Sequence, residues 1–403
     1  MSSSPSPAGS RVLSWLTALF ILGYFIFFTY RGLSSYFTFD DGTTVIAVLK
    51  PFETPWWRDL LHVLTVFTAA FRPLTTLYWR PLYALFGFHP LPYRIVFQLL
   101  MAANIGVAYV LARRLDATRA AAALTALLFS YNASTIDLYY DTCLVGDVMC
   151  FFFCGLALIA FTGDRPRIVA GIVCFLLALD SKEVAVTFPG ILLFYYLLYR
   201  LDDFRDQRRR LRVGGLLLGM FAASAVYLAI KVADMSHNDA YAPHPTVGFL
   251  LSNLAHYLEI LLYFPEKTFS VPVAILILAA VVALGAVLRV RPAIFGVLFF
   301  GTALIPVAAI PSRAGYAAYV AYFGLALSAG TLLDAFRSRI PVREPRAQTA
   351  AAVAFFLAVA IILGFAHAIK RQPTTEYYEW STPAAMALME GFEQTVPEFP
   401  PGA

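Results

Sequence analysis

The sequence has little charge and few cysteines. Only 14% of its 403 residues are Asp, Glu, Lys or Arg, 60% are hydrophobic, and the mean hydropathy is +0.71. This composition excludes an ordinary water-soluble domain. The four cysteines all lie in apolar stretches and form no CxxC motif, so we predict small buried side chains rather than metal ligands. The sequence contains no internal repeat and no polar stretch long enough for a separate soluble domain.

Long apolar runs fill most of the chain, and they predict an all-α integral membrane protein. A helix of about 20 apolar residues crosses a bilayer, so we expect a bundle of about 11 transmembrane helices within residues 12–368. The Ser- and Pro-rich residues 1–11 are expected to be disordered, and residues 369–403 form a C-terminal tail. The predicted spans are residues 12–30, 93–111, 119–136, 143–162, 167–180, 184–200, 213–231, 271–288, 293–310, 315–334 and 349–368.

The positive charges favour one orientation of these spans. The connections after the second, fourth, sixth, eighth and tenth spans contain many arginines and no lysine, whereas most acidic residues lie in the other connections. Cytoplasmic loops are enriched in Lys and Arg, so we expect a cytoplasmic N terminus and an external C terminus. The net charge of +5 then reflects a basic cytoplasmic face, and we expect no nucleic-acid partner. The first span lacks a small-residue cleavage site, which favours a retained span over a secretory signal.

Two of the external segments are long, and each contains a candidate interfacial helix. In the first, residues 31–92, Trp56 and Trp57 precede apolar residues at helical spacing. Tryptophan next to an apolar helical face is typical of a helix that lies in the membrane interface. In the second, residues 232–270, the apolar stretch 246–264 is interrupted by polar side chains. We therefore expect a second surface helix there instead of a span.

Ionisable side chains gather at the external ends of the predicted spans. Asp40 and Asp41 follow the first span, and Lys182 and Glu183 follow the fifth. Charges at a membrane boundary are costly and commonly serve binding or catalysis. Because these residues come from distant parts of the sequence but share one depth, we expect them to line one polar cavity. Its other candidate members are Arg72, Arg80, Asp137, Asp141, Asp147, Asp180 and Arg313.

Such a cavity suits the transfer of a group from a lipid phosphate to a hydroxyl. Arg and Lys bind phosphate, and a carboxylate accepts the proton of an attacking hydroxyl. Asp40 or Asp41 is the candidate base; the other carboxylate is a candidate to orient it, raise its pKa, or bind a divalent cation. Each of these residues also has a simpler interpretation. The Asp pair could belong to a surface loop, and Arg72 could be an arginine that extends its side chain to the membrane interface. Lys182 and Glu183 could form an ion pair on the surface. The shared depth favours the cavity.

Several motifs resemble those of GT-C glycosyltransferases. They are Phe39-Asp40-Asp41, Arg72-Pro73-Leu74-Thr75, Ser181-Lys182-Glu183 with Pro189, and Pro311-Ser312-Arg313 with Tyr316. The pattern is most similar to the membrane half of the transmembrane and tetratricopeptide-repeat O-mannosyltransferases. It is also similar to protein O-mannosyltransferases and to bacterial lipid A aminoarabinose transferases. The resemblance covers residues 12–335, and no tetratricopeptide repeats follow the last span.

The resemblance implies an inverting transferase that uses a polyprenyl-phosphate sugar as donor, at the periplasmic face of a bacterial inner membrane. It implies that Asp40 is the base beside Asp41, and that Arg72, Lys182 and Arg313 bind the donor phosphate. The group differs in metal dependence; Asp40 and Asp41 are the candidate ligands of a divalent metal. The acceptor, a protein, lipid or glycan hydroxyl, stays open. The residues expected to support the polar cavity are Arg80, Asp137, Asp147, Glu183 and Tyr316.

Two other functional classes fit the composition. A transporter or flippase for a lipid-linked or anionic solute typically shows inverted repeats and broken helices near the bilayer midplane. Here no repeat is found, and the charged residues gather at one membrane boundary. A non-catalytic assembly subunit with the same fold would carry degraded motifs. Most motifs are intact, although a Gly-Arg-x-Asp-like element is reduced to Gly146-Asp147. The glycosyltransferase is therefore the favoured interpretation.

Overall fold

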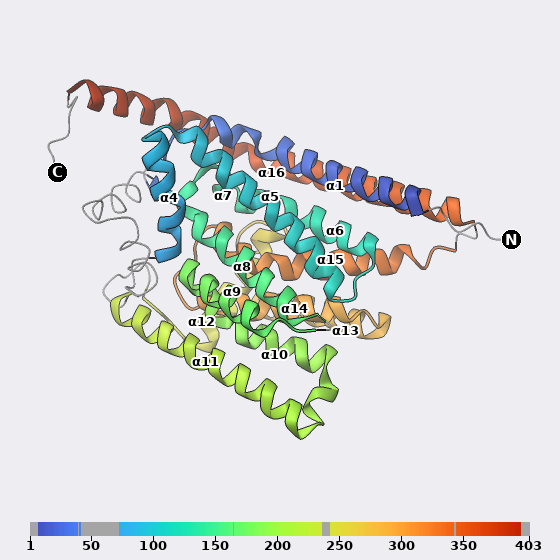
Figure 1. Cartoon of the computed structure of the whole chain (residues 1–403). Coiled ribbons are helices and arrows are strands. Elements are labelled where there is room, and N and C mark those ends of the chain that lie inside the picture. Colours follow the sequence, from blue (N-terminus) through green and yellow to red (C-terminus); the bar gives the residue numbers. More distant parts are fainter. Residues whose placement is uncertain are drawn as a thin grey trace.

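A computed structural model describes most of the chain. Within the described ranges every regular element is a helix, and the helices pack into one bundle (Figure 1). The predicted all-α membrane fold is thereby confirmed. The candidate interfacial helix that follows Trp56 and Trp57 lies outside the described residues. The described ranges are 7–38, 40–41, 72–163, 165–235, 242–341 and 344–395.

Eleven helices coincide with the eleven predicted spans. In the described part of the chain, eight helices are long and apolar enough to cross a membrane. The helices at the third, fifth and sixth predicted spans are apolar but shorter, with 12, 14 and 12 residues. The spans are α1 (Pro7–Thr29), α5 (Pro90–Arg114), α6 (Arg119–Ser130), α8 (Val145–Phe161), α9 (Ile168–Ser181), α10 (Phe188–Tyr199), α11 (Gln207–Met235), α13 (Val271–Leu288), α14 (Arg291–Ala308), α15 (Tyr319–Arg337) and α16 (Pro345–Thr395).

Short helical elements cover one end of the bundle, which we call the capped end. Two polar side chains cap the starts of short helices there: Asn132 accepts the N–H of Ser134, and Asp141 accepts the N–H of Cys143. The opposite end carries the N terminus and the arginines of α5 and α15, and we call it the arginine end (Figure 1). The capped end comprises η1 (Tyr30–Ser34), α4 (Pro73–Phe86), η2 (Ala133–Thr135), α7 (Asp137–Tyr140), η3 (Thr142–Leu144), η4 (Glu183–Thr187) and η7 (Gly315–Ala318).

Small residues allow the central helices to approach closely. A Cβ added to Gly324 of α15 would lie 2.3 Å from the carbonyl oxygen of Gly296 in α14. Small residues at helix contacts are characteristic of membrane bundles, where packing replaces the hydrophobic effect as the driving force. Aromatic rings complete this core: Phe129 of α6 lies 4.5 Å from Phe151 and 5.1 Å from Tyr319 between ring centroids. The rigid centre formed in this way supports the capped end.

The predicted second surface helix, residues 246–264, is present as α12 (Val247–Leu261). Its polar side chains Asn253 and Glu259 are buried against the protein. The Asn253 amide donates to the carbonyls of Ala308 and Ile310, both at 2.9 Å. The buried Glu259 carboxylate accepts two backbone N–H groups of the loop that follows α12. These polar residues therefore satisfy the backbone at the ends of neighbouring elements and dock α12 onto the bundle.

The last span continues beyond its predicted end at residue 368. Helix α16 runs without a break to Thr395, so most of the predicted tail is helical. Figure 1 shows α16 beside α1 along the bundle and then projecting at the capped end. Within the projecting part Thr375 and Tyr378 are buried, whereas Tyr377 is 61% exposed. One face of this extension is therefore packed against the bundle.

Candidate functional site

Asp41 is fully buried and is held by four hydrogen bonds. Its Oδ2 accepts from the Arg94 guanidinium at 3.1 Å and from the Thr38 N–H at 3.0 Å. Its Oδ1 accepts the Thr142 hydroxyl and the Cys143 N–H, both at 2.7 Å. These donors compensate the burial of the carboxylate and fix it in one orientation. Asp41 therefore organises this end of the fold and offers no open lone pair towards solvent.

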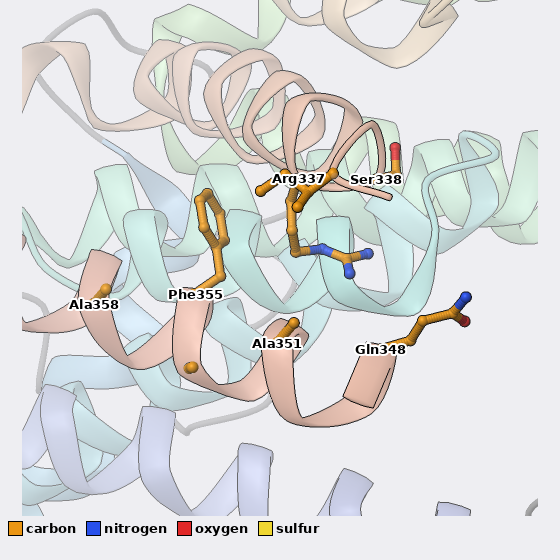
Figure 2. A pocket seen from close by; sticks show the side chains of 8 residues that line it. Arg337, Ser338, Gln348, Ala351, Phe355 and Ala358 are labelled. Carbon is orange, nitrogen blue, oxygen red and sulfur yellow. The ribbon is translucent and has the colours of Figure 1, made fainter. Parts of the chain in front are cut away.

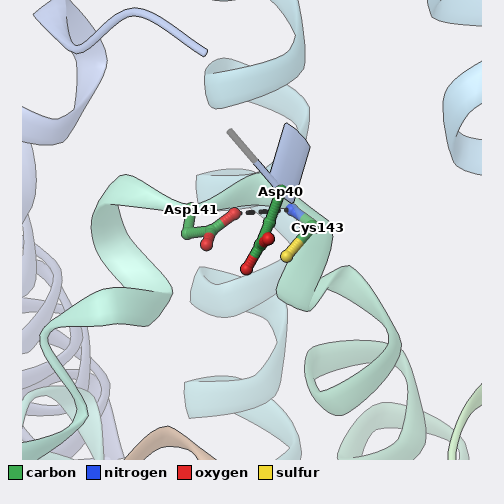
Figure 3. A group of neighbouring side chains, drawn as sticks. All are labelled: Asp40, Asp141 and Cys143. Carbon is green, nitrogen blue, oxygen red and sulfur yellow. Dashed lines mark hydrogen bonds between the residues drawn. The ribbon is translucent and has the colours of Figure 1, made fainter. Parts of the chain in front are cut away.

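Asp40 is exposed, in contrast to its neighbour. Its carboxylate meets Asp141 and Cys143: one ligand atom from each of the three residues lies within 4.8 Å of the others (Figure 3). Figure 3 marks the bond from the Cys143 N–H to Asp141 Oδ1, at 3.1 Å. Asp141 Oδ1 also accepts the Thr38 hydroxyl at 3.1 Å. We call Asp40, Asp141 and Cys143 the carboxylate cluster.

The carboxylate cluster combines two carboxyl groups of different environment. Burial raises the pKa of Asp141 to about 8, and the charge of Asp41 adds to the rise, while the Cys143 N–H opposes it. At neutral pH the side chain of Asp141 is therefore mostly protonated beside the exposed Asp40. A neutral carboxyl next to an exposed carboxylate is an arrangement that receives and relays a proton. The sequence predicted Asp40 with Asp41 as the pair for such chemistry, and the structure shows that the carboxyl of Asp141 also lies beside Asp40.

The carboxylate cluster is also a possible ligand set for a divalent cation. Two carboxylate oxygens and one thiol are ligands that Zn²⁺ accepts, whereas Mg²⁺ prefers oxygen alone. Asp41, which the sequence suggested as a ligand together with Asp40, directs its oxygens to four hydrogen-bond donors instead. The residues suited to a metal are therefore Asp40, Asp141 and Cys143.

A second group of charges, which we call the cation cluster, joins α4, α8, η4 and α11. The Arg72 guanidinium contacts Glu183 at two points, Nε to Oε1 at 3.3 Å and Nη2 to Oε2 at 3.2 Å. Lys182 Nζ lies 2.7 Å from Asp147 Oδ2. Lys231 Nζ is buried and lies 3.6 Å from Glu183 Oε1. Three cations thus converge on two carboxylates at the capped end.

A glycine makes this convergence possible. A Cβ added to Gly146 would lie 2.7 Å from the carbonyl oxygen of Ser181 and 3.3 Å from Cδ of Arg72. The start of α8 can therefore approach the end of α9 only because residue 146 has no side chain. This approach brings Asp147 to Lys182, and it lets the aliphatic part of Arg72 pass over the helix start.

The remaining predicted residues also lie at the capped end, but in other contacts. Asp137 begins α7 and accepts the Tyr378 hydroxyl at 2.7 Å. Arg313 follows α14, and its backbone N–H donates to the Tyr257 hydroxyl of α12 at 2.9 Å. Tyr316 belongs to η7, which packs on α7 and η2. Arg80 is half-buried, two turns after Arg72 on α4. Arg72 and Lys182 are thus brought together, whereas Arg313 is fixed on the α12 side.

The sequence analysis missed two buried cations of the capped end, Arg94 beside Asp41 and Lys231 in the cation cluster. Arg94 lies in the first turns of α5, and Lys231 lies in α11 near its end. Both fall inside predicted spans, where an ionisable residue is by default a functional suspect. That signal was present in the sequence and was sufficient to find them. Thr38 and Thr142 offered no such signal, because threonine is common at the ends of membrane helices.

A cavity of about 550 Å³ lies elsewhere, between the end of α15 and the start of α16. Figure 2 shows Arg337, Ser338 and Gln348 at one side and the Phe355 ring at the other. Arg337 already contacts Asp334 through Nε and Nη2, at 2.9 and 2.7 Å. The cavity is at the arginine end, and its lining includes no residue of the carboxylate cluster or the cation cluster.

No protein-family model and no curated protein matches the chain. Among solved structures, the chain is similar to ArnT from Cupriavidus metallidurans bound to undecaprenyl phosphate. The TM-score is 0.46 with 16% sequence identity over 93% of this chain and 75% of that chain. ArnT in the apo state gives a TM-score of 0.39 with 16% identity over 76% of this chain and 63% of that chain. Both comparisons show a similar arrangement of helices only. The chain itself is a multi-pass, all-α membrane protein, and in its described residues Asp41, Arg94, Asp147 and Lys231 are buried at the capped end.

Proposed function

We propose that the chain is a GT-C type glycosyltransferase that moves a sugar from a polyprenyl-phosphate donor to an acceptor hydroxyl. The observation that carries the proposal is the proximity of the two clusters. Cys143 of the carboxylate cluster precedes Asp147 of the cation cluster by four residues, about one helical turn. An exposed carboxylate and a group of phosphate-binding cations are therefore neighbours at the capped end, as the sequence motifs led us to expect.

In this proposal Asp40 is the base. The acceptor oxygen attacks the anomeric carbon of the sugar while the hydroxyl proton passes to Asp40. The bond from that carbon to the phosphate oxygen breaks, and the electron pair leaves with the polyprenyl phosphate. A single displacement inverts the anomeric configuration. Asp41 does not serve as the base, because four donors occupy its oxygens.

The cation cluster stabilises the leaving phosphate. The Nε–Nη2 edge of Arg72 contacts Glu183, and the Nη1–Nη2 edge of the same plane matches two phosphate oxygens; Lys182 adds a point charge. Their partners Glu183 and Asp147 hold both cations in place before the donor binds. Charge that develops on the phosphate during the reaction then meets preoriented donors, which lowers the barrier. Arg313 extends the same end of the site on the α12 side.

A divalent cation at the carboxylate cluster is compatible with this scheme. Asp40, Asp141 and Cys143 would hold it, and it would supply Lewis-acid activation of the acceptor hydroxyl. With or without it, Asp40 orients the acceptor. The many arginines at the other end support an external position for the capped end, which in a bacterial inner membrane is the periplasmic face. The lipid bilayer and a lipid-linked donor are then the immediate partners, and the acceptor is a protein, lipid or glycan hydroxyl.

The test is donor consumption by the purified protein in lipid discs. A panel of labelled polyprenyl-phosphate sugars is offered with and without chelator, and loss of sugar from the lipid is followed. One donor is expected to turn over, and Asp40→Asn is expected to lower kcat by roughly 10²- to 10⁴-fold, the usual contribution of a general base. Asp202→Asn, which changes an exposed carboxylate at the arginine end, is the matched control and retains activity.

Two outcomes would overturn parts of the proposal. Full activity in Asp40→Asn would remove Asp40 from the role of base. Failure of every donor to bind, measured by retention of labelled lipid on the protein, would remove the glycosyltransferase assignment. A transporter or flippase, or a non-catalytic subunit with the same fold, would then be favoured.

A further inference from the structure

The extension of α16 contacts the segment that carries Asp141. The Tyr378 hydroxyl donates to Asp137 Oδ1 at 2.7 Å. The Tyr378 ring stacks on Tyr140, with 4.6 Å between ring centroids and 5° between planes. Tyr378 is only 9% exposed in an otherwise projecting helix. One side chain of the extension thus holds both the first and the last residue of α7.

This contact continues directly to Asp141. The carbonyl of Asp137 accepts the N–H of Asp141 at 2.8 Å, which closes α7. The Asp141 carboxyl then accepts the Thr38 hydroxyl and the Cys143 N–H. A chain of hydrogen bonds therefore leads from Tyr378 through Asp137 to Asp141 and the carboxylate cluster.

Helix α16 also holds the start of the segment that runs from η2 to α7. The Tyr263 hydroxyl accepts the N–H of Ala133, the first residue of η2, at 2.6 Å, and it lies 2.6 Å from His367 Nδ1. Lys370 Nζ donates to the Tyr263 carbonyl at 3.4 Å. Helix α16 thus holds the segment from η2 to α7 at both ends.

The hydrogen bond from Tyr378 to Asp137 persists over the ordinary pH range. Burial raises the pKa of Tyr378, and the charge of Asp137 raises it further. The hydroxyl therefore keeps its proton and remains a donor. A buried hydrogen bond combined with a parallel ring stack leaves α7 little freedom, since both a polar and an apolar contact must break before it moves.

We propose that Tyr378 is a positioning residue for Asp141, so that the extension of α16 forms part of the candidate site. The contacts define this role without reference to any reaction, whereas its effect on turnover rests on the proposed function. In the absence of the Tyr378 hydroxyl, α7 and η3 open more often, and the carboxylate cluster spends less time assembled.

The first experiment measures the thiol of Cys143 and needs no substrate. Cys143 is half-buried in the carboxylate cluster, so its alkylation by a small maleimide in lipid discs reports the opening of η3. Cys174, the other half-buried cysteine, is replaced by Ala in all variants. Tyr378→Phe, which keeps the ring stack, is expected to speed labelling roughly 3- to 10-fold, as loss of one buried hydrogen bond predicts. Tyr377→Phe, on the exposed face, is the control and leaves the rate unchanged.

The second experiment uses donor turnover. Tyr378→Phe is expected to lower kcat and to leave the donor KM unchanged, because Tyr378 contacts Asp137 and Tyr140, which lead to the carboxylate cluster. Asp137→Asn keeps an oxygen that accepts the Tyr378 hydroxyl and retains most of kcat, whereas Asp137→Ala does not. Labelling of Cys143 at the wild-type rate in Tyr378→Phe would overturn the positioning role, whatever the turnover. If the wild type consumes no donor, the proposed function fails while the labelling result still decides the role of Tyr378.

Discussion

The Arg94 guanidinium lies 3.1 Å from the Asp41 carboxylate, and their side chains are 2% and 0% exposed. Arg94 comes from the start of α5 and also donates to the carbonyl of Tyr36 at 2.7 Å. It therefore ties the turn that carries both aspartates to the second span. Taking two charges out of water is expensive, and the pair is tolerated because each charge compensates the other. Removal of one partner leaves the other charge buried alone.

Arg94→Met is expected to lower the free energy of unfolding by roughly 3–5 kcal/mol, the usual cost of breaking a buried ion pair. The measurement is thermal or denaturant unfolding in detergent. The double variant Arg94→Met/Asp41→Asn should recover part of the loss, because it removes the uncompensated charge. Arg205→Met is the control, since Arg205 and Asp202 form an ion pair that is 76% and 84% exposed. If Arg205→Met lowered the free energy of unfolding as much as Arg94→Met, burial would not explain the stabilising effect of the Arg94–Asp41 pair.

The stability of the fold should fall as the pH rises through the titration of Asp141. Its pKa is raised from 3.8 to about 8, first by burial and then by Asp41. The folded state therefore binds more protons than the unfolded state between these values. The stabilisation is fully present below about pH 4 and is lost as the pH rises through about 8.

Asp141→Asn should remove this dependence, because the amide does not titrate. The Tm of the wild type minus that of Asp141→Asn is expected to decrease steadily from pH 5 to pH 9, measured by thermal unfolding in detergent. Asp202→Asn, at the arginine end, provides a curve that should run parallel to the wild type. Parallel curves for wild type and Asp141→Asn would show that the carboxyl keeps an ordinary pKa.

The sequence identified the aspartate pair but did not indicate that Asp41 is buried and Asp40 is exposed. Hydropathy and charge are local properties of the chain, so the spans and the depth of Asp40 and Asp41 could be predicted from them. Which carboxylate turns inwards depends on Thr38, whose N–H and hydroxyl close the turn, and on Arg94, 53 residues further along. Contacts of that kind are set by tertiary packing, and a single sequence carries no record of them.

The cation cluster was predictable for a similar reason, and the α16 extension was not. Arg72, Lys182 and Glu183 are charges at a membrane boundary, which is a strong signal in an apolar chain. Tyr378 is one of many tyrosines, and its partner Asp137 lies 241 residues away in the sequence. The tail looked like a separate external segment because its composition is polar and contains proline. Its helix forms as a continuation of α16, and one face is then buried on α7.

Arg72→Ala is expected to raise the donor KM roughly 10- to 100-fold, the loss expected for charged hydrogen bonds to a phosphate. Arg72→Lys should recover only part of the affinity, because lysine offers a point charge instead of a planar guanidinium that can contact Glu183 with one edge and the phosphate with another. The measurement is initial rate against donor concentration in lipid discs. Arg208→Ala, which removes an exposed arginine at the arginine end, should leave the donor KM unchanged. An unchanged donor KM in Arg72→Ala would place the phosphate elsewhere.

Gly146→Ala should disturb the cation cluster without changing any charge. The added methyl group would lie 2.7 Å from the Ser181 carbonyl oxygen, a backbone atom that cannot move aside cheaply, and 3.3 Å from Arg72 Cδ. Overpacking of this kind costs roughly 1–3 kcal/mol. Separation of α8 from α9 also lengthens the contact between Asp147 and Lys182. We therefore expect both a lower Tm and a higher donor KM.

Gly106→Ala in α5 is the matched control for the same chemical change. A Cβ at Gly106 meets no atom within 4 Å in the described part of the chain, and alanine is the better helix former. Its Tm should equal or exceed that of the wild type, and its donor KM should not change. If Gly146→Ala behaved like Gly106→Ala in both measurements, the close approach of α8 to Ser181 would not be needed for the cation cluster. If it lowered only the Tm, that approach would serve folding, and Lys182 would reach the phosphate without it.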